Sequence, residues 1–250
     1  MPSPRRHTAA AGPAPRRRRS RGELERRLIV DAALALSARE EGYEGLTFQA
    51  LGDELGVHPT AIYRHFRDKD ELMLTLVEAI HAEVLAGLPP PGTDWAADLS
   101  LLALRSYEVF LRFPAISQVA AVRTTRSENE FQVVERIVGC LQRAGFDDAD
   151  AAVYYRAFSD VLLGYVALDA GFAALRPATR EGDLRAWSVN YRSLPAERFP
   201  GLAATAALIP AVADPANFTT ALDLLIEAIR ARAGKGGERC EAGTGPAAGR

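Results

Sequence analysis

The segment from Thr47 to Lys69 constrains the fold of this chain more than any other part of the sequence. Its apolar spacing predicts two short amphipathic helices that meet at Gly56-Val57. The second helix carries a polar edge made of Thr60, Tyr63, Arg64 and His65. Two short helices joined in this way are typical of a helix-turn-helix, whose second helix lies in the major groove of DNA. The segment therefore predicts a sequence-specific DNA-binding domain.

Local signals indicate where these two helices begin. Thr47 is the expected N-cap of the first helix, and Leu46 and Leu51 stand at the positions of a hydrophobic staple. Pro59 occupies the first position of the second helix, where its missing N–H costs little. We expect this reading helix to span residues 59–66.

Helical periodicity continues along the rest of the chain, without the alternation typical of strands. The sequence therefore predicts an all-α fold, in which a three-helix helix-turn-helix domain precedes a larger helical ligand-binding and dimerisation domain. Four prolines make 176–213 a loop with short helices, and Ser127 with Glu130 predicts a capping box. The expected parts are a disordered arm at 1–22, the DNA-binding domain at 23–86, the second domain at 93–233 and a disordered tail at 234–250.

The charge is distributed unevenly along the chain. Residues 1–22 contain seven arginines and no acidic residue, whereas residues 23–86 contain six basic and thirteen acidic residues, which leaves a net charge of −7. Because an acidic domain repels DNA, we expect the arm to follow the adjacent minor groove and neutralise phosphates. The alternative is a solvated tail without a partner. The arm residues expected at DNA are Arg16, Arg17, Arg18, Arg19 and Arg21.

Other functional classes find little support in the sequence. Cys140 and Cys240 supply neither a disulfide framework nor a metal-binding spacing. No histidine follows His81, and the chain lacks a Gly-rich phosphate loop, a CxxC pair and a Ser-centred elbow. Catalysis, a cofactor and a bound metal are therefore not expected. The sequence has no apolar run of membrane-spanning length and no secretory signal, so a cytoplasmic protein without a membrane partner is expected.

The segment GLTFQALGDELGVHPTAIYRHFRDKDELM resembles the tetracycline-repressor family of bacterial transcriptional regulators. Its most similar parts are Leu55-Gly56-Val57, Tyr63-Arg64-His65-Phe66 and Lys69-Asp70-Glu71-Leu72. Over residues 94–233 the helix order is similar, and LQRAGF before a long helix resembles the family's ligand domain. The resemblance implies a homodimer on a palindromic operator, acting as a repressor that a small molecule releases. The alternative is a helical DNA-binding or protein-interaction module without an effector.

The residues expected to contact DNA lie on and around the reading helix. Thr60 and Arg64 are four residues apart on one helix face, from which Arg64 can reach guanine O6 and N7. His58 stands where the family usually has a small hydroxyl cap, so we expect it to cap poorly and its ring to be free for DNA. The resemblance implies that Tyr63 and His65 contact phosphate or sugar groups of the DNA. The full set in the reader is Thr47, His58, Pro59, Thr60, Tyr63, Arg64, His65 and Lys69.

Aromatic residues in the second domain predict an effector pocket, although most of them are also compatible with an ordinary core. The expected lining comprises Tyr107, Phe110, Arg123, Phe131, Tyr155, Ser159, Tyr165 and Trp187. The family's tetracycline repressor recognises a drug–magnesium chelate with the help of histidine. The four histidines here lie outside residues 93–233, at His7, His58, His65 and His81. We therefore expect an unidentified effector that is largely apolar or aromatic, and not tetracycline.

Two helices of the second domain are apolar over a wide arc, which requires a second packing partner. One begins near Asp147, and the other runs from Asp214 to about Ala233. Packing both against their symmetry mates predicts a four-helix dimer interface; the alternative is that both are interior helices. The interface residues expected are Val161, Leu168, Phe172, Leu222, Leu225 and Ile229. The helix from Lys69 to about Ala86 is expected to act as the lever between the domains.

Overall fold

The computed structural model describes residues 25–39 and 45–242, with side chains described through residue 233. All regular elements in these ranges are helices, so the all-α prediction is confirmed. The arginines at positions 16–21 lie outside the described residues. Within these ranges no single helix is long and apolar enough to cross a membrane. Asp148–Ala173 and Pro177–Ser193 reach the required length and apolar composition only when taken together, and the two segments are bent by 111° relative to each other.

Among the described residues of the N-terminal domain, the helices are α1 (Arg26–Ser37), α3 (Phe48–Leu55) and α4 (Pro59–Ile62). Thr47 Oγ1 accepts a hydrogen bond from Ala50 N at 3.0 Å, which confirms the predicted cap. Ile62 and Phe66 are fully buried in the core of this domain. The reading helix is shorter than expected, because after Ile62 the chain continues in tight turns through His65.

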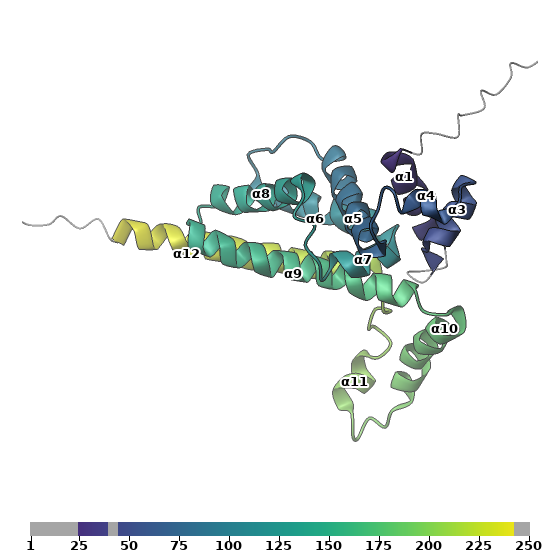
Figure 1. The fold of residues 1–250 in the computed structure, drawn as a ribbon. Helices are drawn as coiled ribbons and strands as arrows, with labels where there is room; N and C mark the ends of the chain where they lie inside the picture. The colour runs from purple at the N-terminus through teal and green to yellow at the C-terminus, as the bar shows by residue number, and fades with distance from the viewer. Residues whose placement is uncertain (1–24, 40–44, 243–250) are drawn as a thin grey trace, which may run out of the picture.

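The long helix α5 (Lys69–Ala86) connects the two domains. Asp68 caps it by accepting a hydrogen bond from Glu71 N at 2.8 Å. Its apolar side is buried along its whole length, from Leu72 to Val84. It packs against α1 of the reader and against helices of the second domain, so it belongs to both (Figure 1).

In the second domain, α6, α7 and α8 pack against α5, and α9 and α12 lie beyond them. Within it, α9 and α12 lie side by side as a long antiparallel pair, and α6 packs against both (Figure 1). The short α7 lies between α5 and α9, where its backbone contacts both. The bounds are α6 (Trp95–Leu111), α7 (Pro114–Ala120), α8 (Glu128–Arg143), α9 (Asp148–Ala173) and α12 (Pro215–Ala242).

An excursion between α9 and α12 projects away from the rest of the chain (Figure 1). It contains two short α-helices with no buried residue, which agrees with the loop and short helices expected there. Its elements are α10 (Pro177–Arg185), the π-turn η1 (Ala186–Asn190), the 3₁₀ turn η2 (Tyr191–Ser193) and α11 (Pro200–Thr205).

The outermost helices have bounds that differ from those expected. α12 continues to Ala242, whereas the sequence predicted an end near Ala233 and a disordered tail from residue 234. Glycines there weaken helix propensity, but a helix that is already nucleated propagates residue by residue. At the other end, α1 begins at Arg26 with Glu25 as its N-cap, and residues 23 and 24 lie outside the described residues.

Candidate DNA-reading surface and effector cavity

The reading surface is formed by side chains that project from α4 and the turns after it. Tyr63 is 58% exposed, and Thr60 and Arg64 are also exposed, whereas His65 is half-buried. The Tyr63 ring lies edge-on against Phe48, with 4.6 Å between ring centroids. This contact fixes the position of the exposed Tyr63 side chain. These positions agree with the expected reading edge, but contact with DNA stays a prediction.

His58 caps α4, so the expectation that it caps poorly is wrong. Its Nδ1 accepts a hydrogen bond from Thr60 N at 3.3 Å and lies 2.9 Å from Thr60 Oγ1. The extended backbone of His58 places the imidazole where a serine hydroxyl would otherwise bind. The ring therefore holds the start of the reading helix.

Two glycines allow the tight joint between α3 and α4. Gly56 has φ of +66°, a left-handed conformation that other residues adopt at a cost. A Cβ on Gly52 would stand 2.8 Å from the carbonyl oxygen of Val57, because the chain folds back directly over this position. Sequence analysis missed Gly52, although a glycine four residues before the joint was visible.

Arg26 fastens the reader to the start of α5. Its guanidinium donates to the His65 carbonyl at 2.6 Å, to Glu71 Oε1 at 3.0 Å and to Thr75 Oγ1 at 3.1 Å. It also lies over the ring of Phe66, 4.1 Å from the centroid. The backbone N–H of Arg67, together with Arg26, holds the pKa of the Glu71 carboxyl below its usual range. The orientation of the reading turn is thus tied to α5 by one side chain that sequence analysis did not identify.

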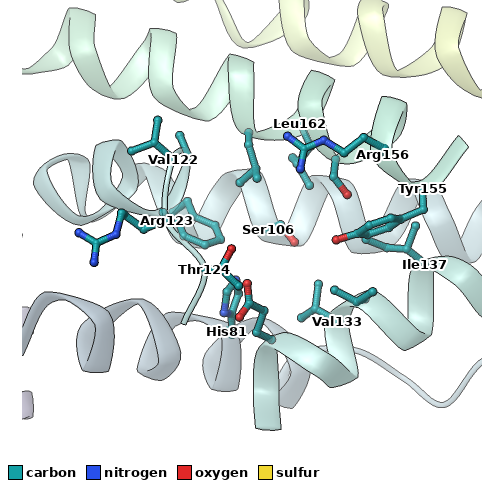
Figure 2. Close-up of a pocket in the computed structure, with 17 residues that line it drawn as sticks. His81, Ser106, Val122, Arg123, Thr124, Val133, Ile137, Tyr155, Arg156 and Leu162 are labelled. Atoms are coloured by element: carbon teal, nitrogen blue, oxygen red, sulfur yellow. The ribbon is translucent and has the colours of Figure 1, made fainter. Parts of the chain in front are cut away.

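A cavity of about 220 Å³ lies in the second domain, between α5, α6, α8, α9 and the segment after α7 (Figure 2). Four of the eight predicted pocket residues line it: Phe110, Arg123, Tyr155 and Ser159. The hydroxyl of Tyr155 points toward its centre, whereas the guanidinium of Arg123 points away from it (Figure 2). Sequence analysis missed the wall formed by Val133 and Ile137 of α8.

The other four predicted residues do not line this cavity. Tyr107 is buried on the opposite side of α6, where it stacks on Phe218 of α12 at 4.2 Å. Phe131 is 55% exposed on α8. Tyr165 and Trp187 line a second cavity of about 490 Å³, beside α9 and the start of α12. Sequence spacing places an aromatic residue on a helix, but the neighbouring helix decides which side of it faces the cavity.

His81 lines the effector cavity, which corrects the view that histidines lie outside the effector site. The reason is that α5, assigned to the reader by sequence, also forms a wall of the second domain. His81 Nδ1 is buried and has no hydrogen-bond partner among the described side chains, and its ring lies edge-on to Phe110 at 5.6 Å between centroids. Burial lowers the pKa of His81, although Glu130 and Glu78 act in the opposite direction, so burial favours the neutral imidazole.

The cavity lining is more polar than the expected apolar or aromatic one. Eight of its seventeen residues carry polar or charged side chains. They are His81, Ser106, Arg123, Thr124, Glu130, Tyr155, Arg156 and Ser159. A ligand that fills this cavity therefore needs hydrogen-bonding groups as well as apolar surface.

Arg123 connects the cavity to the first turn of α5. Its stem lines the cavity, while Nη1 and Nη2 form a bidentate pair with Asp70 Oδ1 and Oδ2 at 2.6 and 2.9 Å. This guanidinium lowers the pKa of the Asp70 carboxyl. Asp70 follows Lys69 directly, and Lys69 is a predicted phosphate contact. A displacement of the cavity wall at Arg123 thus reaches the edge of the reading surface through one ion pair.

Glu78 makes a second connection, between the middle of α5 and the start of α8. Its carboxylate accepts hydrogen bonds from the Ser127 hydroxyl, from Asn129 N at 3.3 Å and from Asn129 Nδ2 at 2.5 Å. The predicted capping box is therefore wrong, because Ser127 turns toward Glu78 and leaves its own helix uncapped. Glu130 instead accepts a bond from Arg126 N at 2.6 Å.

The predicted dimer interface is partly wrong. Leu222 and Ile229 are 3% and 2% exposed, because this side of α12 packs on α6 and α9 within the chain. Leu168 is 57% exposed, while Val161, Phe172 and Leu225 are half-buried. Leu224 of α12 and Val153 of α9, both 63% exposed, were not predicted. The outer surfaces of α9 and α12 thus remain open to a partner, through the expected Leu168 and through Val153 and Leu224, which were not expected.

Two family models match this chain. Residues 88–233 match the one described as "Tetracyclin repressor-like, C-terminal domain", and residues 29–76 match "Bacterial regulatory proteins, tetR family". An HTH-type transcriptional regulator of Saccharopolyspora erythraea is 29% identical over 177 residues, which are 69% of this chain and 73% of that protein. The tetracycline repressor protein class D of Escherichia coli is 30% identical over 148 residues, 57% of this chain and 65% of that protein.

Solved structures show the same fold. ActR of Streptomyces coelicolor in complex with (S)-DNPA superimposes with a TM-score of 0.68 and 26% identity, over 83% of this chain and 98% of that one. A TetR variant of Acinetobacter baumannii in complex with minocycline has a TM-score of 0.58 and 24% identity, over 84% and 99% of the two chains. The second likeness shows the fold alone.

Proposed function

This chain belongs to the tetracycline-repressor family of bacterial transcriptional regulators, and we propose that a small molecule bound in the effector cavity releases it from its operator. The observation that carries the proposal is the bidentate pair between Arg123 and Asp70. It joins a residue of the cavity wall to the residue beside Lys69. DNA binding and ligand binding therefore share α5, which the sequence analysis expected to be the lever.

The reading turn would enter the major groove with its exposed edge toward the bases. Arg64 suits a bidentate contact with guanine, and Thr60 lies beside it on the same edge. Tyr63 and His65 are placed for phosphate or sugar contacts, which set the register on the duplex. Lys69 and the N-cap Thr47 flank the edge and would bind phosphates from either side.

The arginine arm would supply the positive charge that the reader lacks. Residues 23–86 carry a net charge of −7, whereas residues 1–22 contain seven arginines and no acidic residue. We therefore assign most of the non-specific affinity for phosphates to residues 1–21, and the choice of sequence to α4 and its turn. A regulator that binds chromosomal DNA would act in the cytoplasm, which is the location we propose.

Release would work through a shift between two conformations of the cavity wall. An effector that prefers a displaced segment 120–130 would loosen Arg123 from Asp70 and Ser127 from Glu78. Both contacts lie on α5, so their loss lets this helix tilt together with Arg26 and the reading turn. The DNA-bound and ligand-bound states then differ in the position of α5.

Two copies would pair through the outer surfaces of α9 and α12, where Val153, Leu168 and Leu224 are exposed. A two-fold pair of readers fits a palindromic operator whose half-sites are roughly 34–36 Å apart, one turn of DNA. A tilt of α5 in each copy would change the distance between the two reading turns, so that the dimer no longer fits both half-sites and dissociates from the operator.

The effector that best fits the cavity is an aromatic molecule with several hydroxyl or carbonyl groups. Phe110 and the α8 wall offer apolar surface, while Tyr155, Ser159 and neutral His81 offer hydrogen bonds. (S)-DNPA, which is bound in the structure of the relative ActR, is a suitable first probe.

The proposal is tested by footprinting the purified protein on the DNA that flanks its own gene. We expect two protected half-sites, competed by the same duplex and not by a scrambled one. Release by a probe is then measured as the loss of fluorescence anisotropy of the labelled operator. Equal competition by scrambled DNA contradicts specific reading. If probes bind the protein but leave operator affinity unchanged, the release mechanism is wrong.

A further inference from the structure

The second cavity, of about 490 Å³, shares no lining residue with the effector cavity. It is formed by α9, the first turns of α12, residues 210–213 and Trp187 of the excursion. Its walls are mostly apolar, with Leu168 and Leu224 at the side that faces outward. One acidic side chain, Asp169, lines it.

Asp169 is a buried carboxylate without a positive partner. It is 6% exposed, and its Oδ2 accepts a hydrogen bond from the Tyr107 hydroxyl. Within the part of the chain that the structure describes, no Lys, Arg or His nitrogen lies within 4.0 Å of it. Burial and the Asp169 hydrogen bond raise the pKa of Tyr107, so this phenol keeps its proton for the hydrogen bond and adds no positive charge. A buried carboxylate is costly to leave uncompensated.

The start of α12 does not supply the missing positive charge. Asp214 caps this helix, and its Oδ1 accepts a hydrogen bond from Ala216 N at 2.9 Å. The Asp214 carboxylate also acts on the Tyr107 hydroxyl in the same direction as Asp169. The field at the floor of the cavity is therefore negative, and it disfavours an anionic ligand.

Aromatic rings complete the arrangement around Asp169. Tyr165 and Trp187 line the cavity, and the indole of Trp187 is stacked on Tyr191, with 4.4 Å between centroids and 2° between planes. Tyr107 is fixed by its stack on Phe218. An ammonium or guanidinium group is attracted to the faces of such rings as well as to a carboxylate.

We propose that this cavity binds a small organic cation, an amine or guanidine with an apolar or aromatic body. The cationic group lies against Asp169, and the body lies against Tyr165 and Trp187. The site is independent of the effector cavity. Because its outward side adjoins the surfaces assigned to the dimer, its occupancy stabilises the pairing of two copies.

The experiment compares three probes of similar shape on the full-length protein by calorimetry. They are 2-phenylethylamine, the neutral 2-phenylethanol and the anionic 3-phenylpropanoate. We expect the amine to bind at least about tenfold more tightly than the alcohol, and the carboxylate to bind most weakly. Asp169→Asn keeps an acceptor for Tyr107 and removes this tenfold preference. Trp187→Leu keeps the carboxylate and weakens the amine and the alcohol alike.

Three results overturn the proposal. Equal affinity for the amine and the alcohol removes the role of charge. Full amine affinity in Asp169→Asn places the cation elsewhere. Weaker dimerisation of Asp169→Asn, without amine binding to the natural chain, assigns the carboxylate to the subunit interface. The thermal unfolding transition of each variant reports an intact fold, and release of the operator by a probe of the effector cavity, measured in parallel, keeps these results separate from a failure of the release mechanism.

Discussion

The reading surface and the effector cavity differ in what positions their residues. The reader is held by contacts between near neighbours, such as Thr47 with Ala50 and His58 with Thr60. The cavity is assembled from five parts of the chain, and its contacts Arg123–Asp70 and Ser127–Glu78 span 53 and 49 residues. A change in the reader should therefore act locally on DNA binding, whereas a change at the cavity should act on both functions.

The largest effect is expected for Tyr63→Ala combined with Arg64→Ala. Removing each side chain's interaction with DNA costs roughly 1–3 kcal/mol, so operator affinity falls by about 30-fold or more, while probe binding in the cavity is unchanged. Anisotropy with labelled operator and calorimetry with the probe measure the two functions. Arg192→Ala, exposed on the excursion, is the control. If the double variant binds the operator with unchanged affinity, Tyr63 and Arg64 do not form the reading edge.

Deletion of residues 1–21 should weaken binding to any DNA sequence and leave specificity intact. Every phosphate that the arm no longer neutralises flattens the slope of log affinity against log salt by roughly 0.9. Affinities for operator and scrambled duplexes across a salt series test this, with substitution of Arg16 to Arg19 by Gln as a milder variant. An unchanged slope shows that the arm does not touch DNA.

Gly52→Ala should separate stability of the reader from stability of the whole chain. The added Cβ meets the Val57 carbonyl oxygen at 2.8 Å, which is backbone and cannot turn aside. We expect a loss of roughly 1–3 kcal/mol in the free energy of unfolding, together with weaker operator binding. Gly182→Ala on α10, where a Cβ meets nothing within 4 Å, is the matched control. Comparable unfolding curves for the two variants would show that the joint tolerates the extra carbon.

Breaking the pair between Arg123 and Asp70 tests the connection between the two regions. Because both side chains are about half exposed, stability should change by less than ~1 kcal/mol. The ratio of operator affinities without and with effector should fall by about fivefold or more in Arg123→Gln and in Asp70→Asn. Exchanging the two charges should restore part of it. Glu108→Gln removes an ion pair within α6, away from the cavity lining, and serves as the control; an equal loss there would argue against the assigned route.

The smallest effect is expected from the titration of His81. Its pKa is lowered in the folded protein, so below about pH 6.5 the unfolded chain binds a proton that the folded chain does not. The free energy of unfolding should therefore decline as the pH falls through this range. Denaturant unfolding at pH 7.5 and 5.5 measures the decline, which should be smaller in His81→Gln and unchanged in His65→Gln. A pH dependence identical in all three proteins contradicts a neutral, buried imidazole.

Local signals in the sequence were sufficient for the reader and insufficient for the cavity. Thr47 and Pro59 mark helix starts through interactions with residues two to four positions away, which a sequence displays directly. Tyr107 and Phe110 are three residues apart on α6, and only the packing of α12 on that helix decides that Phe110 alone faces the effector. His81 was assigned to the reader because α5 is continuous with it in sequence, whereas in space this helix serves both domains.

The carboxylate of Glu78 fastens the beginning of α8 to the helix that carries the reader. Substitutions that retune ligand preference at residues 123–130 must therefore alter resting repression as well. A variant that acquires a new inducer through substitutions in this segment would also show a changed level of expression of the repressed gene in the absence of inducer. Restoring tight control would then require a second, compensating substitution on α5.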